Sequence, residues 1–294
     1  MTQVPGQPLR VCIAGATGWA GRALVPAVLQ AADLRLSGAV ARRAAGQDVA
    51  VALGLPAAGV EVSPTVEGAL ENQTDVLVDY TGPLAVKRHT LLALERGTAV
   101  VIGTSGLTGD DYREIAAAAE RHALGVIAAG NFSISAALAT YFATLAGRLI
   151  PNWEIIDYAH GDKIDVPSGT ARELAERLGR TRGERLVRPI AELVGPPEAR
   201  GADVQGTRVH SIRLPGHVIA LEALFGAPDE RLTIRYEAGP GAGPYLSGTL
   251  MAVRQVVRLR VLVRGLDRLL QLQGVLPASM DSATGESSLA RGQC

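Results

Sequence analysis

Three glycines near the start of the chain, Gly15, Gly18 and Gly21, restrict the possible folds more than any other sequence feature. They separate an apolar run, Leu9–Ala14, from a stretch with helical spacing, Trp19–Ala32. A strand that turns directly into a helix needs a residue free to adopt positive φ, and glycines let the backbone approach a diphosphate whose charge the helix N-terminus stabilises. A structural turn without a ligand is the alternative. We predict a dinucleotide site contacted by Gly15, Ala16, Thr17, Gly18, Trp19, Ala20 and Gly21.

The alternation of strand, turn and helix continues to about residue 130. Helical spacing recurs at Asp110–Ala123. Further strands are predicted at Leu34–Ala41, Asp75–Tyr80, Ala99–Ile102 and Gly125–Ala129. Strands that alternate with helices are typical of a doubly wound parallel sheet. The first part of the chain is therefore predicted to be a Rossmann-type α/β domain.

The pattern changes after about residue 150, where strands follow one another. A helix, Ser168–Leu178, and a Pro/Gly-rich connection, Pro189–Thr207, interrupt them. The predicted strands are Trp153–His160, Arg208–Leu214, Val218–Phe225 and Leu232–Ala238. Successive strands without crossover helices form antiparallel or mixed sheets, so we predict a second domain of α+β type.

These patterns divide the chain into two predicted domains and a tail. Residues 1–130 are predicted to bind the dinucleotide, and residues 241–278, with helical spacing at Leu246–Leu259, to pack back onto that domain. Residues 131–240 are predicted to form the substrate-binding domain. The polar residues 279–294 are predicted to be a disordered tail.

The end of the second strand bears on the choice of cofactor. It carries Arg42 and Arg43 and no carboxylate. An acidic residue there would bond the ribose 2′-hydroxyl of NAD, whereas two guanidinium groups suit a 2′-phosphate. We predict NADPH as the preferred cofactor, with NADH and a merely solvated arginine pair as the alternatives. The turns after later strands should line the nicotinamide half through Tyr80, Thr81, Gly103, Thr104 and Ser105.

Composition and charge argue against several classes of protein. The formal net charge is +0, whereas the phosphate contacts of a nucleic-acid-binding protein need a basic surplus. The apolar stretch Ile127–Ile150 is interrupted by polar and charged residues, so we expect no membrane span. Cys12 and Cys294 provide no disulfide framework, and no signal peptide is visible. We expect a cytoplasmic protein without a metal site.

A second candidate site surrounds one of the few lysines. Lysine and arginine together number 29, yet Lys87 and Lys163 are the only lysines. An ammonium can give up a proton and a guanidinium cannot, so a retained lysine indicates a function, with chance as the alternative. His160, upstream of Lys163, could donate a hydrogen bond to a substrate oxygen, or be an ordinary surface histidine. After Pro167, the predicted helix starts with free N–H groups and hydroxyls that suit a carboxylate, at Ser168, Gly169 and Thr170.

The segment Glu154–Ala171, with its Lys-x-Asp-x-Pro-Ser-Gly-Thr-Ala motif, resembles the signature of the 4-hydroxy-tetrahydrodipicolinate (dihydrodipicolinate) reductase family. The glycine turn and the stretches DVLVDYTGP, VIGTSGLT, GNFSISAAL and VHSIRLPG are similar to the family in the same order. The resemblance implies hydride transfer from NAD(P)H to a cyclic unsaturated dicarboxylate in lysine and diaminopimelate biosynthesis. It implies Lys163 as proton donor or electrostatic stabiliser, His160 as a substrate contact and residues 168–170 as the carboxylate cradle.

The resemblance also implies how the domains cooperate. Asn131 would lie at an interdomain crossover that allows closure over the substrate. The sheet of residues 131–240 would mediate oligomerisation, into a homotetramer or a dimer.

The chain departs from the family signature at the expected acid. The first histidine of the family's pair is Ala159 here, which cannot transfer a proton, and Tyr158 should face the other side of the strand. Ala220 and Leu221 stand where relatives often have polar residues, so we expect a more apolar pocket.

Three hypotheses therefore stay open. The chain performs the family's reaction, or it is a paralogue that acts as an imine reductase or amine dehydrogenase on a more apolar substrate, or it is a non-catalytic NADPH-binding protein. An amine dehydrogenase would use a carboxylate such as Glu222 or Asp165. The retained Lys163 argues against the non-catalytic hypothesis.

Overall fold

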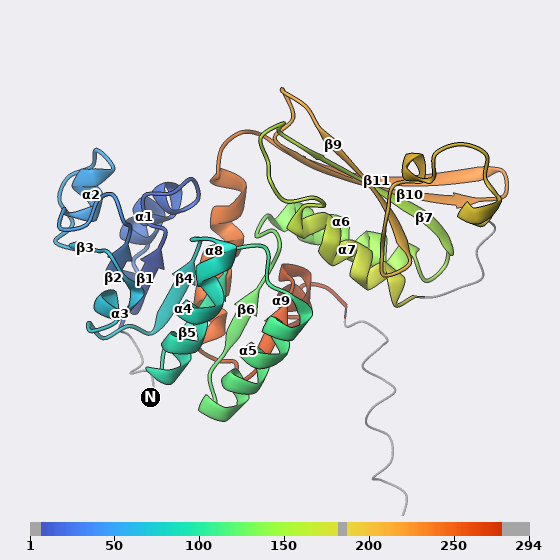
Figure 1. Cartoon of the computed structure of the whole chain (residues 1–294). Coiled ribbons are helices and arrows are strands. Elements are labelled where there is room, and N and C mark those ends of the chain that lie inside the picture. Colours follow the sequence, from blue (N-terminus) through green and yellow to red (C-terminus); the bar gives the residue numbers. More distant parts are fainter. Residues whose placement is uncertain (1–6, 182–186, 278–294) are drawn as a thin grey trace, which may run out of the picture.

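The computed structural model describes residues 7–181 and 187–277, so the predicted tail lies outside the described residues. Figure 1 shows two sheets, with α6 (Ile134–Ala146) and α7 (Gly169–Gly179) lying between the second sheet and the N-terminal part. Within the described ranges no helix combines the length and apolar character needed to cross a membrane.

The first sheet is parallel throughout, as predicted. Its strand order is β12-β6-β5-β4-β1-β2-β3. The bounds are β1 (Leu9–Ala14), β2 (Leu34–Val40), β3 (Val62–Ser63), β4 (Val76–Asp79), β5 (Ala99–Ile102), β6 (Val126–Ala128) and β12 (Leu262–Arg264). The order reverses between β1 and β4, and ligands of open α/β sheets bind in the crevice outside the carboxyl ends of the strands at such a switch point.

Helices cover both faces of this sheet because its strands carry apolar residues on both sides. One face packs against α1 (Gly21–Gln30), α8 (Gly243–Val256) and α9 (Leu266–Leu272). The other face packs against α4 (Pro83–Glu95) and α5 (Gly109–His122), with the short helix α3 (Val66–Ala69) alongside; α2 (Val49–Ala52) precedes β3. Cys12 lies in this second layer, where burial and, to a lesser degree, the charge of Asp79 raise the pKa of its thiol to about 12.

The second sheet is mixed, which confirms the predicted α+β character. Its order is β11-β10-β7-β9-β8, with β7 and β9 parallel and the other pairs antiparallel. The bounds are β7 (Asn152–Ala159), β8 (Ala202–Val204), β9 (Thr207–Arg213), β10 (Ile219–Ala227) and β11 (Glu230–Ala238). Burial alternates along β7, and its buried side packs against α6 and α7.

Several elements differ from the sequence prediction. Helix α1 begins at Gly21 rather than Trp19, because the Gly18 amide bonds back to the Gly15 carbonyl and keeps these residues in a turn. The predicted connection Pro189–Thr207 contains β8, the first residue of β9 and two 3₁₀ helices, η1 (Ile190–Glu192) and η2 (Pro197–Arg200). Helix α6 was not predicted because apolar residues surround it, so it shows no single apolar stripe.

The chain passes between the two sheets twice, at residues 129–133 and at residues 239–242. After the second crossing, α8, β12 and α9 rejoin the first sheet. The domain boundaries stay a prediction.

Candidate active site

The glycine turn has the backbone geometry that a diphosphate needs. Gly15 has φ +83°, and a Cβ there would lie 2.5 Å from the carbonyl oxygen of Tyr80. A Cβ at Gly21 would overlap the carbonyl oxygen of Gly15. The first turn of α1 holds no acidic residue, and no side chain caps it, so its N–H groups stay available to an anion. These residues fit the cofactor that the sequence predicts.

Trp19 connects the glycine turn to the second interdomain crossing. Its indole is about half exposed, and its Nε1 donates to the carbonyl oxygen of Pro240 at 3.3 Å. Its ring lies edge-on to Tyr245, with centroids 5.4 Å apart. The turn and the start of α8 are therefore held together.

Arg42 and Arg43 are exposed at the end of β2, and neither has an ion pair or hydrogen-bonded side chain among residues 7–181 and 187–277. The nearby carboxylate of Asp48 is engaged as the cap of α2 and accepts five backbone N–H groups. The two guanidinium groups thus carry positive charge that no described carboxylate pairs.

The turns on the nicotinamide side are shaped by the buried carboxylate of Asp79. It accepts hydrogen bonds from the Thr81 amide at 2.9 Å and hydroxyl at 2.7 Å, and from the Thr104 hydroxyl at 3.0 Å. His89 Nδ1 lies 2.8 Å away. Tyr80 is also engaged, because its hydroxyl pairs with Thr249 at 2.8 Å and burial raises its pKa. These side chains shape the loops, and the backbone is left to face a ligand.

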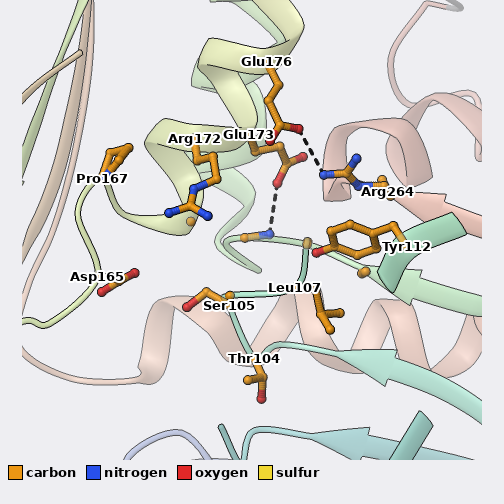
Figure 2. Close-up of a pocket in the computed structure, with 15 residues that line it drawn as sticks. Thr104, Ser105, Leu107, Tyr112, Asp165, Pro167, Arg172, Glu173, Glu176 and Arg264 are labelled. Carbon is orange, nitrogen blue, oxygen red and sulfur yellow. Dashed lines mark hydrogen bonds and ion pairs between the residues drawn. The ribbon is translucent and has the colours of Figure 1, made fainter. Parts of the chain in front are cut away.

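A small cleft lies between the two parts of the molecule (Figure 2). Its lower wall is the turn after β5, residues 104–107, and its upper wall is the start of α7 with residues 165–167 before it. A Cβ at Gly169 would lie 3.0 Å from Ser105 Cβ, so the nicotinamide-side turn and the helix start are in close contact. The cleft thus brings Thr104, Ser105 and Gly169 together.

The hydroxyl of Ser168 is already engaged within the protein. Ser168 Oγ donates to Asp157 Oδ1 at 2.6 Å, and its amide donates to Oδ2 at 2.9 Å. Asp157 is fully buried and is also paired with Arg213 at 2.8 Å. Thr170 Oγ1 is directed at the Gly130 carbonyl, 3.4 Å away. The predicted cradle of hydroxyls is therefore reduced to backbone N–H groups of α7.

Lys163 and His160 lie beside the cleft without lining it. Lys163 Nζ pairs with Asp165 at 2.6 Å, and Asp165 itself lines the cleft. His160, half exposed, pairs with Asp162 at 2.6 Å. Asn131 lines a smaller neighbouring hollow; its Oδ1 accepts from the Ser133 amide, while its buried Nδ2 has no partner in the described part of the chain.

Among the residues that line the cleft, the sequence did not predict Tyr112, Arg172, Glu173, Glu176 and Arg264. Arg264 lies over the Tyr112 ring, with its guanidinium carbon 4.0 Å from the centroid. Glu173 accepts from the Gly130 amide at 3.0 Å and pairs with Arg177, which also bonds Asp267. Arg172 alone had a sequence signal, because a side chain one turn into a helix points back toward its N-terminus.

Profiles of two halves of one family match the chain. "Dihydrodipicolinate reductase, N-terminus" matches residues 9–132, and "Dihydrodipicolinate reductase, C-terminus" matches residues 131–275. The chain belongs to the dihydrodipicolinate reductase family. A 4-hydroxy-tetrahydrodipicolinate reductase from Moorella thermoacetica is 38% identical over 269 residues, which cover 90% of this chain and 98% of that relative.

Solved structures agree with this assignment. A dipicolinate-bound dihydrodipicolinate reductase from Paenisporosarcina sp. TG-14 is 32% identical, with a TM-score of 0.72 over 90% of this chain and 100% of that chain. An amine dehydrogenase from Mycobacterium smegmatis is 16% identical, with a TM-score of 0.61 over 86% and 93% of the two chains, and shows a shared fold alone. Family and fold indicate an oxidoreductase that uses a nicotinamide cofactor, as predicted.

The departure at residue 159 is a local change in this dihydrodipicolinate reductase fold. Ala159 is fully buried in a row across the sheet, between Ile219 of β10 and Arg213 of β9. Tyr158 faces the other side, as expected, with its hydroxyl 3.3 Å from Glu222. Ala159 therefore provides no proton donor at this position, and the adjacent Tyr158 of β7 does not reach the same face.

Ala220 and Leu221 do not line the cleft, so the more apolar pocket expected from them is not found. Leu221 is buried in the core against α6 and α7, and Ala220 shares the outer face with Tyr158. Glu222 is on that outer face too, paired with Arg235 at 3.0 Å. Of the two carboxylates considered for an amine dehydrogenase, only Asp165 lines the cleft among the described residues. The alternation of side chains along β10 explains the correction.

Proposed function

We propose that this chain catalyses the reduction of 4-hydroxy-tetrahydrodipicolinate, or a closely related cyclic unsaturated dicarboxylate, with NADPH as the preferred cofactor. The observation that carries the proposal is the contact of the nicotinamide-side turn at Ser105 with the start of α7 at Gly169 across one cleft. Reduction needs a hydride donor and a carboxylate site side by side, and the closeness of these two segments supports that arrangement.

The cofactor would be held by backbone groups and by the arginines at the end of β2. The Gly15–Gly21 turn would bind the diphosphate, Arg42 and Arg43 the 2′-phosphate, and the backbone at Tyr80–Thr81 and Gly103–Ser105 the nicotinamide. When bound, the cofactor supplies the hydride.

The protein's own groups would bind and protonate the substrate. The N–H groups of Gly169 and Thr170 would hold one carboxylate at the positive end of α7. Lys163 and Asp165 form a partly exposed ion pair, and such pairs are worth only about 0–1 kcal/mol, so a substrate carboxylate can replace Asp165 at little cost. Lys163 would then supply the proton, or stabilise the charge that develops, with His160 contacting a substrate oxygen.

The test is NADPH oxidation with three substrate classes: the freshly generated dihydrodipicolinate precursor, simple cyclic imino acids, and ketones with ammonia. Turnover of the dicarboxylate alone supports the proposal. Turnover confined to imino acids or to ketones would replace it with an imine reductase or an amine dehydrogenase. No turnover, with NADPH still bound, would favour a binding protein.

Replacing Arg42 tests the cofactor preference. Arg42→Ala should raise the KM for NADPH about tenfold, because a hydrogen bond to a charged group contributes about 1.5–3 kcal/mol. The KM for NADH should change less than about twofold, since NADH has no 2′-phosphate. Arg35→Ala, on the exposed side of the same strand, is the control. A clear wild-type preference for NADH would contradict the prediction.

The lack of an acid at Ala159 favours a second candidate, an imine reductase. Restoring the acid distinguishes the two. Ala159→His combined with Ile219→Ala should raise kcat on the dicarboxylate about 10-fold to 100-fold if the site is a weakened form of the family's site. The second change is needed because Ile219 lies directly opposite and an added imidazole would overpack the row. Ile219→Ala alone is the control, and no gain in the double variant would favour the imine reductase.

We also propose that the chain is a cytoplasmic homo-oligomer, a tetramer or dimer built through the outer face of the second sheet. That face includes Leu224 and Tyr158 beside paired charges such as Arg235 with Glu222. Light scattering of the purified chain tests it, and a monomer at micromolar concentration would contradict it.

A further inference from the structure

The charged side chains of the cleft in Figure 2 are paired, with one exception. Asp165 pairs with Lys163 at 2.6 Å, and Glu176 pairs with Arg264 at 3.3 Å. Glu173 pairs with Arg177 at 2.6 Å. The side chain of Arg172 has no hydrogen bond and no ion pair with any described residue, so it carries the uncompensated charge of this cleft.

The position of Arg172 directs its charge at the space where a substrate must lie. It is in the first turn of α7, four residues after Ser168. Figure 2 shows its guanidinium directed toward the space between Asp165 and Ser105. A guanidinium presents a rigid fork of donors that matches a carboxylate, and beside a helix N-terminus it makes a strongly anion-attracting wall.

The ribose phosphate of the cofactor is not the partner of this charge. Arg42 and Arg43 follow β2, while the cleft follows β5 and β6. β2 and β5 are separated by β1 and β4, and three strand spacings amount to about 14 Å. The other ligand that the proposed function brings to this cleft is a dicarboxylate, of which the N–H groups of α7 can hold one end.

We propose that Arg172 is a specificity-determining residue that binds the second carboxylate of the substrate. The inference rests on the proposed function, because it takes the substrate to be a dicarboxylate. It explains how a helix start whose Ser168 hydroxyl is engaged by Asp157 can still select a doubly charged ligand.

Two pyridine acids test the inference: pyridine-2,6-dicarboxylate, which has both carboxylates, and pyridine-2-carboxylate, which has one. Their affinities are measured by calorimetry with the full chain saturated with NADP⁺. Arg172→Gln should weaken binding of the dicarboxylate about tenfold or more. It should change the affinity for the monocarboxylate less than about twofold. Arg172→Lys keeps the charge and loses the forked geometry, so its affinity for the dicarboxylate should lie between those of the wild type and Arg172→Gln.

Arg180→Gln is the matched control, because Arg180 is exposed at the other end of α7 and distant from the cleft. It should leave both affinities unchanged, and thermal unfolding of all variants should match the wild type. Unchanged dicarboxylate affinity in Arg172→Gln overturns the inference, and so does an equal loss for both acids. After either of these two results, turnover of a dicarboxylate by the wild type would still support the proposed function, with no part in it for Arg172. A wild type that binds neither acid counts against the proposed function itself.

Discussion

Lys163→Ala is expected to lower kcat on the true substrate by about 10²-fold to 10³-fold while NADPH affinity stays within about twofold. With Ala159 unable to transfer a proton, the proposed function assigns that transfer to Lys163, which pairs with the cleft residue Asp165. Its ion pair with Asp165 is partly exposed and weak, so removing the lysine should cost little folding stability. Steady-state kinetics and a fluorescence titration with NADPH measure the two quantities separately.

Lys87→Ala is the control for this prediction, because Lys87 is the only other lysine of the chain. It lies on α4 and is paired with Glu114 at 2.6 Å and Asp111 at 3.0 Å; the Glu114 hydrogen bond, more than that of Asp111, raises its pKa. Its loss should change kcat less than about twofold. A Lys163→Ala enzyme with normal kcat would show that another group provides the proton.

Gly21→Ala is expected to weaken NADPH binding by about 100-fold and to lower the melting temperature. The added methyl group would overlap the Gly15 carbonyl and the Ala16 backbone, and backbone cannot move aside as a side chain can. Relieving the overlap shifts the turn away from the diphosphate, which loses at least one charge-assisted hydrogen bond of about 1.5–3 kcal/mol. Overpacking itself costs about 1–3 kcal/mol of folding stability.

Gly243→Ala is a close structural control, because Gly243 is the first residue of α8 as Gly21 is of α1. A Cβ at Gly243 meets nothing within 4 Å, so the variant should bind NADPH normally and unfold near the wild-type temperature. Normal NADPH affinity in Gly21→Ala would mean that the diphosphate does not lie on this turn.

The features that sequence reasoning predicted well depend on neighbours in the chain. The glycine turn, the apolar strands and the helix start after Pro167 each follow from a few consecutive residues, because turn geometry and side-chain periodicity are local. The same locality explains why the sequence correctly predicts Tyr158 on the face opposite Ala159.

The features that it missed depend on residues far apart in sequence. The hydroxyl of Ser168 was predicted to face a ligand, but Asp157, eleven residues earlier on β7, accepts it. Leu221 was expected to line the pocket, but the register of β10 against β7 places it in the core. A local sequence pattern does not indicate which carboxylate will accept a hydrogen bond from which hydroxyl, because that depends on how strands and helices pack.

The amino-acid sequence by itself therefore determined the family, the two kinds of sheet and the dinucleotide turn, since these rest on short-range geometry. Only the tertiary structure decided which charges stay uncompensated, since pairing depends on which strands and helices come together. Lys163 has its Asp165 and Arg264 its Glu176, whereas Arg172 is left facing the cleft. We propose that this difference in pairing sets the substrate preference of the chain, because an unpaired, half-buried cation gains most from a ligand that neutralises it.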